Sequence, residues 1–174
     1  MTWSYIHAQG RTCSTAPHAA MTSASAPWRP TTCIYRSAAG EVLVDVSGWF
    51  PATSDLRALS PARLLDTRYG VGAPKAPIGK GRAISLQVTG RGGVPASGVK
   101  AVVLNLTATR TQAAGHLSAY PSGGARPNTS VVNYGRDETI ANSVIAKVGA
   151  GGKVGIFSWA GVDAIVDVQG YVLN

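Results

Sequence analysis

Apolar and polar side chains alternate in short segments along most of the chain after residue 80. In residues 100–110, KAVVLNLTATR, the side chains of Val102, Leu104 and Leu106 fall on one face of an extended strand. Such alternation is typical of a strand with one buried face. The same pattern predicts further short strands in residues 84–90, 116–121, 129–135, 139–148, 153–159 and 162–172.

Glycine- and proline-rich stretches separate these segments, as in YGVGAPKAPIGKGR, residues 69–82. Short strands that recur between such turn signals predict an all-β fold, and we expect an antiparallel β-sandwich that is jelly-roll-like. A helix competes with a strand only in residues 137–148, DETIANSVIAKV. The flanking glycines and the β-branched residues of that segment favour a strand.

The end of the chain resembles a segment near its beginning. Residues 33–50 align with residues 155–172 without a gap, and six of the 18 positions are identical, including the shared Asp-Val of EVLVDVSGWF and DAIVDVQGYV. We therefore interpret residues 51–174 as one complete β-sandwich repeat. Residues 1–50 are then an N-terminal extended segment and a hairpin, 33–50, left from a preceding repeat. A lone hairpin is marginally stable in water, so it needs a sheet in this molecule or in another one.

The charge of the chain narrows the classes of partner. Sixteen Lys and Arg residues against eight Asp and Glu residues give a net charge of +8. This balance is compatible with nucleic acid, anionic lipid or an acidic cell-wall polymer. The cations stand singly and no nucleic-acid-binding motif occurs, which argues against nucleic acid. No apolar run approaches the roughly 20 residues that span a bilayer, so we do not expect a membrane-spanning protein.

The chain contains two cysteines, Cys13 and Cys33. They form no CxxC motif and no histidine lies at a zinc-like spacing, so we expect no metal site. Either they form one disulfide or they are two free thiols. The segment between them has little apolar periodicity, and a disulfide would stabilise it by about 3 kcal/mol. We therefore favour the disulfide, which implies an oxidising, extracellular setting.

Six short motifs of this chain together point to a known type of repeat: RLLDTR (63–68), GVPASGV (93–99), AVVLN (101–105), AYPSG (119–123), ANSVIAKVGAGGKV (141–154) and DVQGY (167–171). They resemble an uncharacterised β-rich repeat of secreted actinobacterial proteins, which is often found beside cell-wall hydrolases. The resemblance covers about 60–174 and the segment 33–50. It implies an exported, wall-associated accessory or structural module rather than a catalyst.

The charged residues Arg63, Asp66 and Arg68 of the RLLDTR motif are candidates for an anion- or sugar-binding site. In an extended chain, Asp66 and Arg68 lie on the same face. The alternative is that these charges bond to one another and fix the entry of the chain into the domain, and we favour this alternative. Asp167 is likewise expected to pair with an arginine or to cap a turn.

The exposed aromatic residues are the second set of candidates. Tyr120 and Trp159 could stack on sugar rings, and Trp159 lies in a predicted turn where a role in the core is harder to support. Local packing is the alternative that we favour for Trp159. We expect Trp49, at the end of a strand, to lie in the core. His116 stands alone in the sequence, and no motif of a catalytic nucleophile accompanies it.

These patterns together favour a non-catalytic, exported module of the cell surface that needs no cofactor. We expect a structural or self-associating role, in which hairpin 33–50 adds to the sheet of a neighbouring repeat or of a second copy. A carbohydrate-binding or cell-wall-binding role through Tyr120 and Trp159 is the close alternative. A hydrolase built on Arg63, Asp66 and Arg68 is the second alternative.

Overall fold

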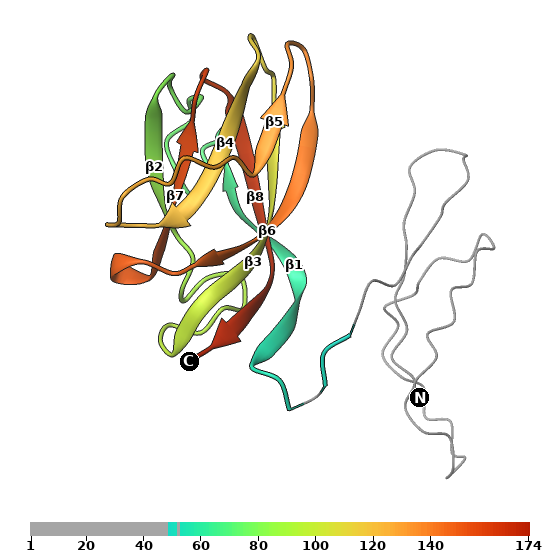
Figure 1. The fold of residues 1–174 in the computed structure, drawn as a ribbon, viewed down its shortest axis with the longest axis vertical. Coiled ribbons are helices and arrows are strands. Elements are labelled where there is room, and N and C mark those ends of the chain that lie inside the picture. The colour runs from blue at the N-terminus through green and yellow to red at the C-terminus, as the bar shows by residue number, and fades with distance from the viewer. Residues whose placement is uncertain (1–48, 52) are drawn as a thin grey trace, which may run out of the picture. The chain divides into compact units, whose positions relative to one another are not determined.

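The computed structural model describes residues 49–51 and 53–174, whose strands form two antiparallel four-stranded sheets packed face to face (Figure 1). The first sheet has the order β1-β8-β3-β6, and the second has the order β2-β7-β4-β5. The elements are β1 (Leu56–Asp66), β2 (Arg82–Gln87), β3 (Val99–Thr109), β4 (Gly115–Pro121), β5 (Val132–Tyr134), β6 (Ile140–Lys147), the 3-10 turn η1 (Ala150–Gly152), β7 (Lys153–Ser158) and β8 (Asp163–Leu173).

The path of the chain between the sheets identifies the type of sandwich. Among the eight described strands, β4 and β5 are the only consecutive ones that pair with each other; every other step crosses to the opposite sheet. Eight antiparallel strands in two sheets with such crossings form a jelly roll. The predicted all-β, jelly-roll-like sandwich is therefore confirmed.

The core follows from the alternation along the strands. On β3, Val102, Leu104 and Leu106 are fully buried, whereas Asn105 and Thr107 are partly exposed on the outer face. Side chains from both sheets meet between them, because each strand directs every second residue inward. The largest fully buried side chains include Leu64, Leu65, Leu86, Leu104, Leu106, Leu117 and Ile156.

Each predicted strand is present, but two have different limits: β2 spans Arg82–Gln87 rather than 84–90, and β5 spans Val132–Tyr134 rather than 129–135. Residues 140–147 form strand β6, as the β-branched residues predicted. Strand β1, which was not among the predicted strands, starts at Leu56 and continues through Pro61. A register shift against β8 between Ala58 and Ala62 interrupts the pairing around this proline, which has no N–H to donate.

Three expectations concern the beginning of the chain. Trp49 was expected in the core, but its side chain is 80 % exposed and lies before the first described strand, so this prediction is wrong. The proposed hairpin 33–50, apart from its last two residues, and the Cys13–Cys33 disulfide fall outside the described residues.

The segment that 33–50 resembles is not itself a hairpin. Strand β7 pairs with β2 and β4, whereas β8 pairs with β1 and β3 in the opposite sheet. Residues 155–172 therefore supply a central strand to each sheet. The sequence could not reveal this, because a short turn between two alternating segments is common to a hairpin and to a crossing between sheets.

Candidate functional site

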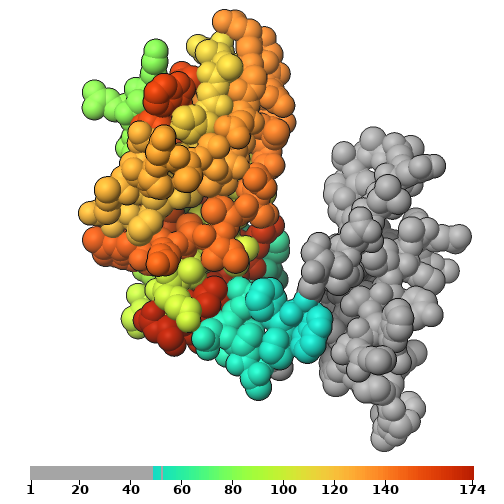
Figure 2. Space-filling view, viewed as in Figure 1, coloured from blue at the N-terminus to red at the C-terminus, as the bar shows by residue number. Residues whose placement is uncertain are grey.

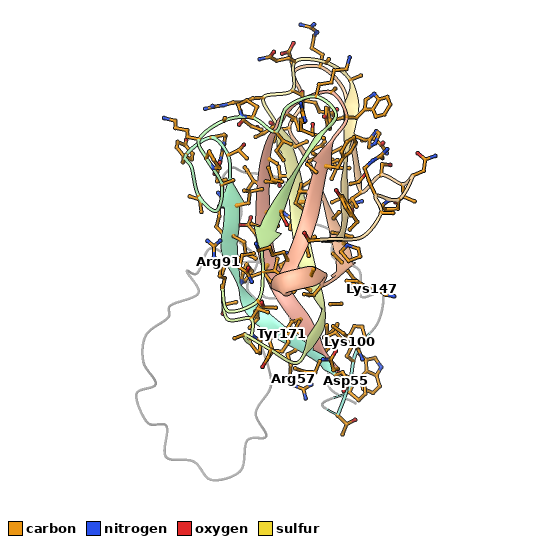
Figure 3. All side chains as sticks on the ribbon, turned by 90° about the vertical axis from the view of Figure 1, so that its left-hand side faces the viewer. Asp55, Arg57, Arg91, Lys100, Lys147 and Tyr171 are labelled. Atoms are coloured by element: carbon orange, nitrogen blue, oxygen red, sulfur yellow. The ribbon has the colours of Figure 1, made fainter. Side chains whose placement is uncertain are left out.

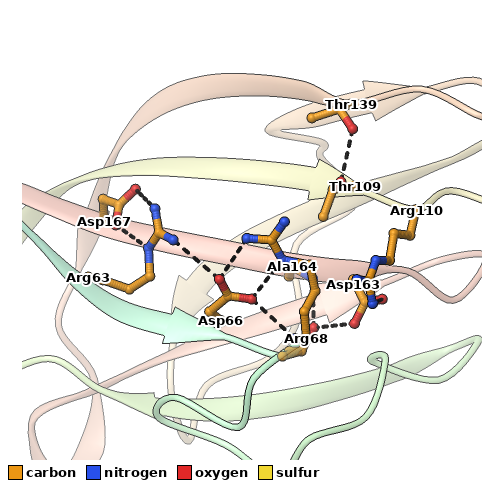
Figure 4. A network of polar contacts seen from close by, with 10 residues as sticks. Arg63, Asp66, Arg68, Thr109, Arg110, Thr139, Asp163, Ala164 and Asp167 are labelled. Carbon is orange, nitrogen blue, oxygen red and sulfur yellow. Dashed lines mark hydrogen bonds and ion pairs between the residues drawn. The ribbon is translucent and has the colours of Figure 1, made fainter.

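The RLLDTR motif ends β1 and joins it to β8. Leu64 and Leu65 are both buried in the core although they are consecutive, because a register shift between Arg63 and Leu65 turns the strand locally. The charged residues of the motif lie on the outer side of this junction, as Figure 4 shows.

Asp66 is the centre of a network of charged hydrogen bonds. Its carboxylate, only 2 % exposed, accepts bonds from Nε and Nη2 of Arg68 at 2.9 and 2.8 Å, and from the Arg68 backbone N–H at 3.1 Å. Nη1 of Arg63 adds a bond at 3.2 Å. Arg63 also binds both carboxylate oxygens of Asp167 on β8, at 2.8 and 3.1 Å. Bidentate arginine–carboxylate pairs of this kind are among the stronger polar contacts in proteins.

Thr67, which follows β1, adds hydrogen bonds to the start of β8. Its hydroxyl donates to the Asp163 carboxylate at 2.6 Å and accepts from the backbone N–H of Ala164 at 3.0 Å. The backbone N–H of Thr67 donates to the carbonyl of Ala164 at 3.1 Å. Thr67 and Asp163 are both buried, so these contacts satisfy polar groups that water does not reach.

The network sets the ionisation of its members. The hydrogen bonds from the Arg68 guanidinium lower the pKa of Asp66 below its ordinary value, although burial acts in the opposite direction. The hydrogen bond to Asp167 raises the pKa of Arg63, and the hydrogen bond to Asp66 raises that of Arg68. These three pKa shifts all favour the charged forms of Arg63, Asp66 and Arg68.

The structure thus brings Arg63, Asp66 and Arg68 together, but their charged groups bond mainly to one another and to Asp167. This is the arrangement expected where charged side chains bond to one another and hold the end of β1 on β8. The same contacts remove the main support for a hydrolase at this site, since a general acid or base needs a group directed at a substrate.

Tyr120 and Trp159 lie on the outer face of the second sheet. His116 and Tyr120 alternate with the buried Leu117 on β4, and Trp159 directly follows β7. The two strands pair so that Tyr120 is opposite Gly155, and the backbone N–H of Trp159 donates to the carbonyl of His116 at 3.0 Å. We call this surface, formed by His116, Tyr120, Phe157 and Trp159, the aromatic face.

The rings of the aromatic face are held by specific contacts. The Tyr120 ring covers Gly155, where a Cβ atom would lie 2.8 Å from the ring. The Trp159 ring stacks on His116 with centroids 5.5 Å apart and planes at 19°, and its side chain is still 52 % exposed. Trp159 therefore both packs locally and presents a ring to solvent.

The loop between β4 and β5, residues 122–131, crosses the outer side of the second sheet (Figure 1), and its orange-yellow atoms lie on the front of the domain in Figure 2. The Ser118 hydroxyl bonds to the carbonyl of Thr129 and fixes the loop. Arg126 on this loop places its guanidinium 4.3 Å from the ring centroid of Phe157, which is consequently buried. Tyr120 and Trp159 lie on either side of this covered ring.

Three of these residues were not candidates from the sequence: His116, which appeared isolated, Phe157 and Arg126. Alternation alone places His116 and Tyr120 on one face of β4. The pairing of β4 with β7, which brings Trp159 beside His116, joins segments about 40 residues apart and has no local signal in the sequence.

No protein-family model matches the chain, and a search of curated proteins found no significant match. Within residues 49–51 and 53–174, no helix is long and apolar enough to cross a membrane. The same described part of the chain contains no group of three or more His, Cys, Asp or Glu residues placed to hold a metal ion.

Proposed function

We propose that this chain is an exported, non-catalytic module of the cell surface that binds polysaccharide through its aromatic face. The observation that carries the proposal is that Tyr120 and Trp159, from different strands, lie on the same outer face. Protein sites for sugars combine aromatic rings with a few polar groups, and Arg126 and the loop 122–131 supply polar groups here. The export rests on the resemblance and on the expected disulfide.

The binding of the full chain to insoluble peptidoglycan and to a panel of soluble polysaccharides tests this function. We expect Tyr120→Ala and Trp159→Ala each to weaken binding about fivefold, which corresponds to about 1 kcal/mol for a stacked ring. Both variants should keep the fold, since neither ring is in the core between the sheets.

Tyr69→Ala is the matched control, because Tyr69 is an exposed tyrosine that follows β1, on the side of the first sheet. It should bind like the wild-type chain. If the wild-type chain binds no polysaccharide of the panel, or if Tyr69→Ala weakens binding as much as Trp159→Ala, the proposal is wrong.

Self-association by strand addition is a second candidate function, and the edge strand β6 favours it. Natural edge strands are protected by charges, prolines or bulges, as β1 is by Arg57, Pro61 and two register shifts. Strand β6, IANSVIAK, carries a charge only at Lys147, and Ile145 is 63 % exposed.

Sedimentation of the full chain over a range of concentrations measures this association. We expect a dimer or larger species that Ile145→Lys converts to monomer, because a charge at the edge opposes pairing with a second strand. The Ser143 N–H already bonds to the Asn142 side chain, so pairing would use the edge groups on either side of it. A wild-type chain that stays monomeric at all concentrations contradicts this second function.

A further inference from the structure

The outer side of β7 alternates between positive charge and aromatic ring. Val154 and Ile156 point into the core, so Lys153, Gly155 and Phe157 face outward. Gly155 is covered by the Tyr120 ring, and Phe157 is covered by the Arg126 guanidinium. Lys153, Tyr120, Arg126 and Trp159 therefore follow one another along about 20 Å of strand, since each residue advances about 3.4 Å.

The two cations of this row have no carboxylate partner among the described residues. The ion pairs within that part of the chain involve Arg63, Arg68, Lys100 and Arg110. Arg126 makes one hydrogen bond to a protein group there, from Nη1 to the Pro127 carbonyl at 3.3 Å. A guanidinium stacked on a ring keeps its N–H edge free to bind a carboxylate or phosphate in two-point geometry.

The whole second sheet also lacks acidic residues. Strands β2, β4, β5 and β7 and the loop 122–131 contain no Asp or Glu. At one end of the domain, by contrast, Lys100 lies 3.3 Å from Asp55, with Arg57 and Lys147 nearby (Figure 3). The strands and the loop that form the aromatic face therefore contribute positive charge and no acidic side chain, which favours an anionic ligand.

We propose that the aromatic face binds an anionic polysaccharide, with its acidic groups at Lys153 and Arg126 and its sugar rings on Tyr120 and Trp159. This inference rests on the proposed function and specifies its ligand as negatively charged. Carboxylate and phosphate groups fit the two cations equally well, so the shared chemistry is a sugar polymer with acidic groups at intervals.

The spacing of the charges favours such a polymer over nucleic acid. Lys153 and the Arg126 guanidinium above Phe157 lie about 14 Å apart along the strand, from four residues at about 3.4 Å each. A nucleic acid carries a charge at every nucleotide, about 3.4 Å apart along each strand of a duplex. Two cations at this spacing would leave most of its phosphates without a partner.

Titration of the full chain with hyaluronan, which carries a carboxylate on every second sugar, and with its neutral methyl ester tests the inference, because the two polymers differ in charge and share the same sugar backbone. A glycerol-phosphate polymer distinguishes phosphate from carboxylate, and a single-stranded oligonucleotide tests nucleic acid. Three variants accompany the wild type: Lys153→Gln, Arg126→Gln and Lys147→Gln. Lys147 is on β6 of the other sheet, so its replacement changes the net charge equally but not the aromatic face.

We expect the charged polymer to bind at least about tenfold more tightly than the ester at low salt, with a difference that shrinks at high salt. Lys153→Gln and Arg126→Gln should each weaken binding of the charged polymer about two- to fivefold, and Lys147→Gln should not. The titration with the glycerol-phosphate polymer shows whether phosphate or carboxylate is preferred, and preference for either one agrees with the inference.

Equal binding of the acid and the ester overturns the anionic ligand but leaves polysaccharide binding intact. Binding of no polysaccharide overturns both this inference and the proposed function. An equal loss for all three variants would indicate attraction by net charge alone and would overturn the site. Tighter binding of the oligonucleotide than of any polysaccharide would overturn the choice of ligand class.

Discussion

Asp66 is the residue on which the first-sheet network depends. Its buried carboxylate accepts bonds from two arginines, and one of these, Arg63, also holds Asp167 on the neighbouring strand. A single acidic side chain thus neutralises Arg68 and links the end of β1 to β8 through Arg63. At the same scale, Gly155 acts through the absence of a side chain, because this leaves room for the Tyr120 ring.

The replacement Asp66→Asn should lower the free energy of unfolding by about 2 kcal/mol, because it removes the charge that two guanidinium groups face in a buried position. Urea unfolding of the full chain measures the change. Asp55→Asn is the control: Asp55 is more than half exposed and pairs only with Lys100, so its loss should change stability by less than about 0.5 kcal/mol. Equal effects of the two variants would show that Asp66 has no special structural role.

The same residue predicts how stability depends on pH. The pKa of Asp66 is lower in the folded chain than its ordinary value of 3.8, so the unfolded chain binds this proton at a higher pH. The ionised Asp66 carboxylate therefore stabilises the folded chain fully above about pH 5, and this stabilisation is lost as the pH falls through the pKa of Asp66 in the folded chain. Asp66→Asn should lose this part of the acid sensitivity; a pH profile parallel to that of the wild type would contradict the assignment.

At the scale of elements, β4 and β7 build the aromatic face as a pair. Neither strand presents more than part of it: β4 supplies His116 and Tyr120, and β7 supplies Gly155 and Phe157 with Trp159 at its end. Their register determines which side chains meet, and a shift by one residue would turn every ring to the other side of the sheet.

Gly155→Ala tests this pairing. The added methyl group would fall 2.8–3.1 Å from three atoms of the Tyr120 ring, so the ring must move away from the sheet. We expect the affinity for polysaccharide to fall about as far as with Tyr120→Ala. The free energy of unfolding, measured with urea, should change by at most about 1 kcal/mol. Gly79→Ala is the control, since a Cβ there meets nothing closer than 3.4 Å. Unchanged affinity in Gly155→Ala would mean that the position of the Tyr120 ring does not matter.

At the scale of the whole molecule, the domain separates a structural side from a candidate binding side. The first sheet carries the hydrogen-bonded network of Arg63, Asp66, Arg68 and Asp167 at the junction of β1 and β8. The second sheet carries the aromatic face, and its strands contain no acidic residue. Part of the positive net charge of the chain therefore lies on the second sheet, whose strands contain cations and no carboxylates.

The sequence predicted the strands because alternation is a local property, as in residues 100–110. It also favoured bonds among Arg63, Asp66 and Arg68, which are close in sequence, and it gave pairing with an arginine as one of two roles for Asp167. It could not identify Arg63 as that arginine, because 104 residues separate them and only the β1–β8 register joins them. The crossing of β7 and β8 to opposite sheets and the contact of His116 with Trp159 were hidden for the same reason.

The most direct measurement is a map of backbone amide shifts in the isotopically labelled full chain during titration with hyaluronan fragments. The account predicts that the perturbed amides concentrate in residues 116–120 and 153–159 and at Arg126. Perturbations confined to residues 63–68 or to the β6 edge, or no perturbation at concentrations where the polymer binds, would contradict it.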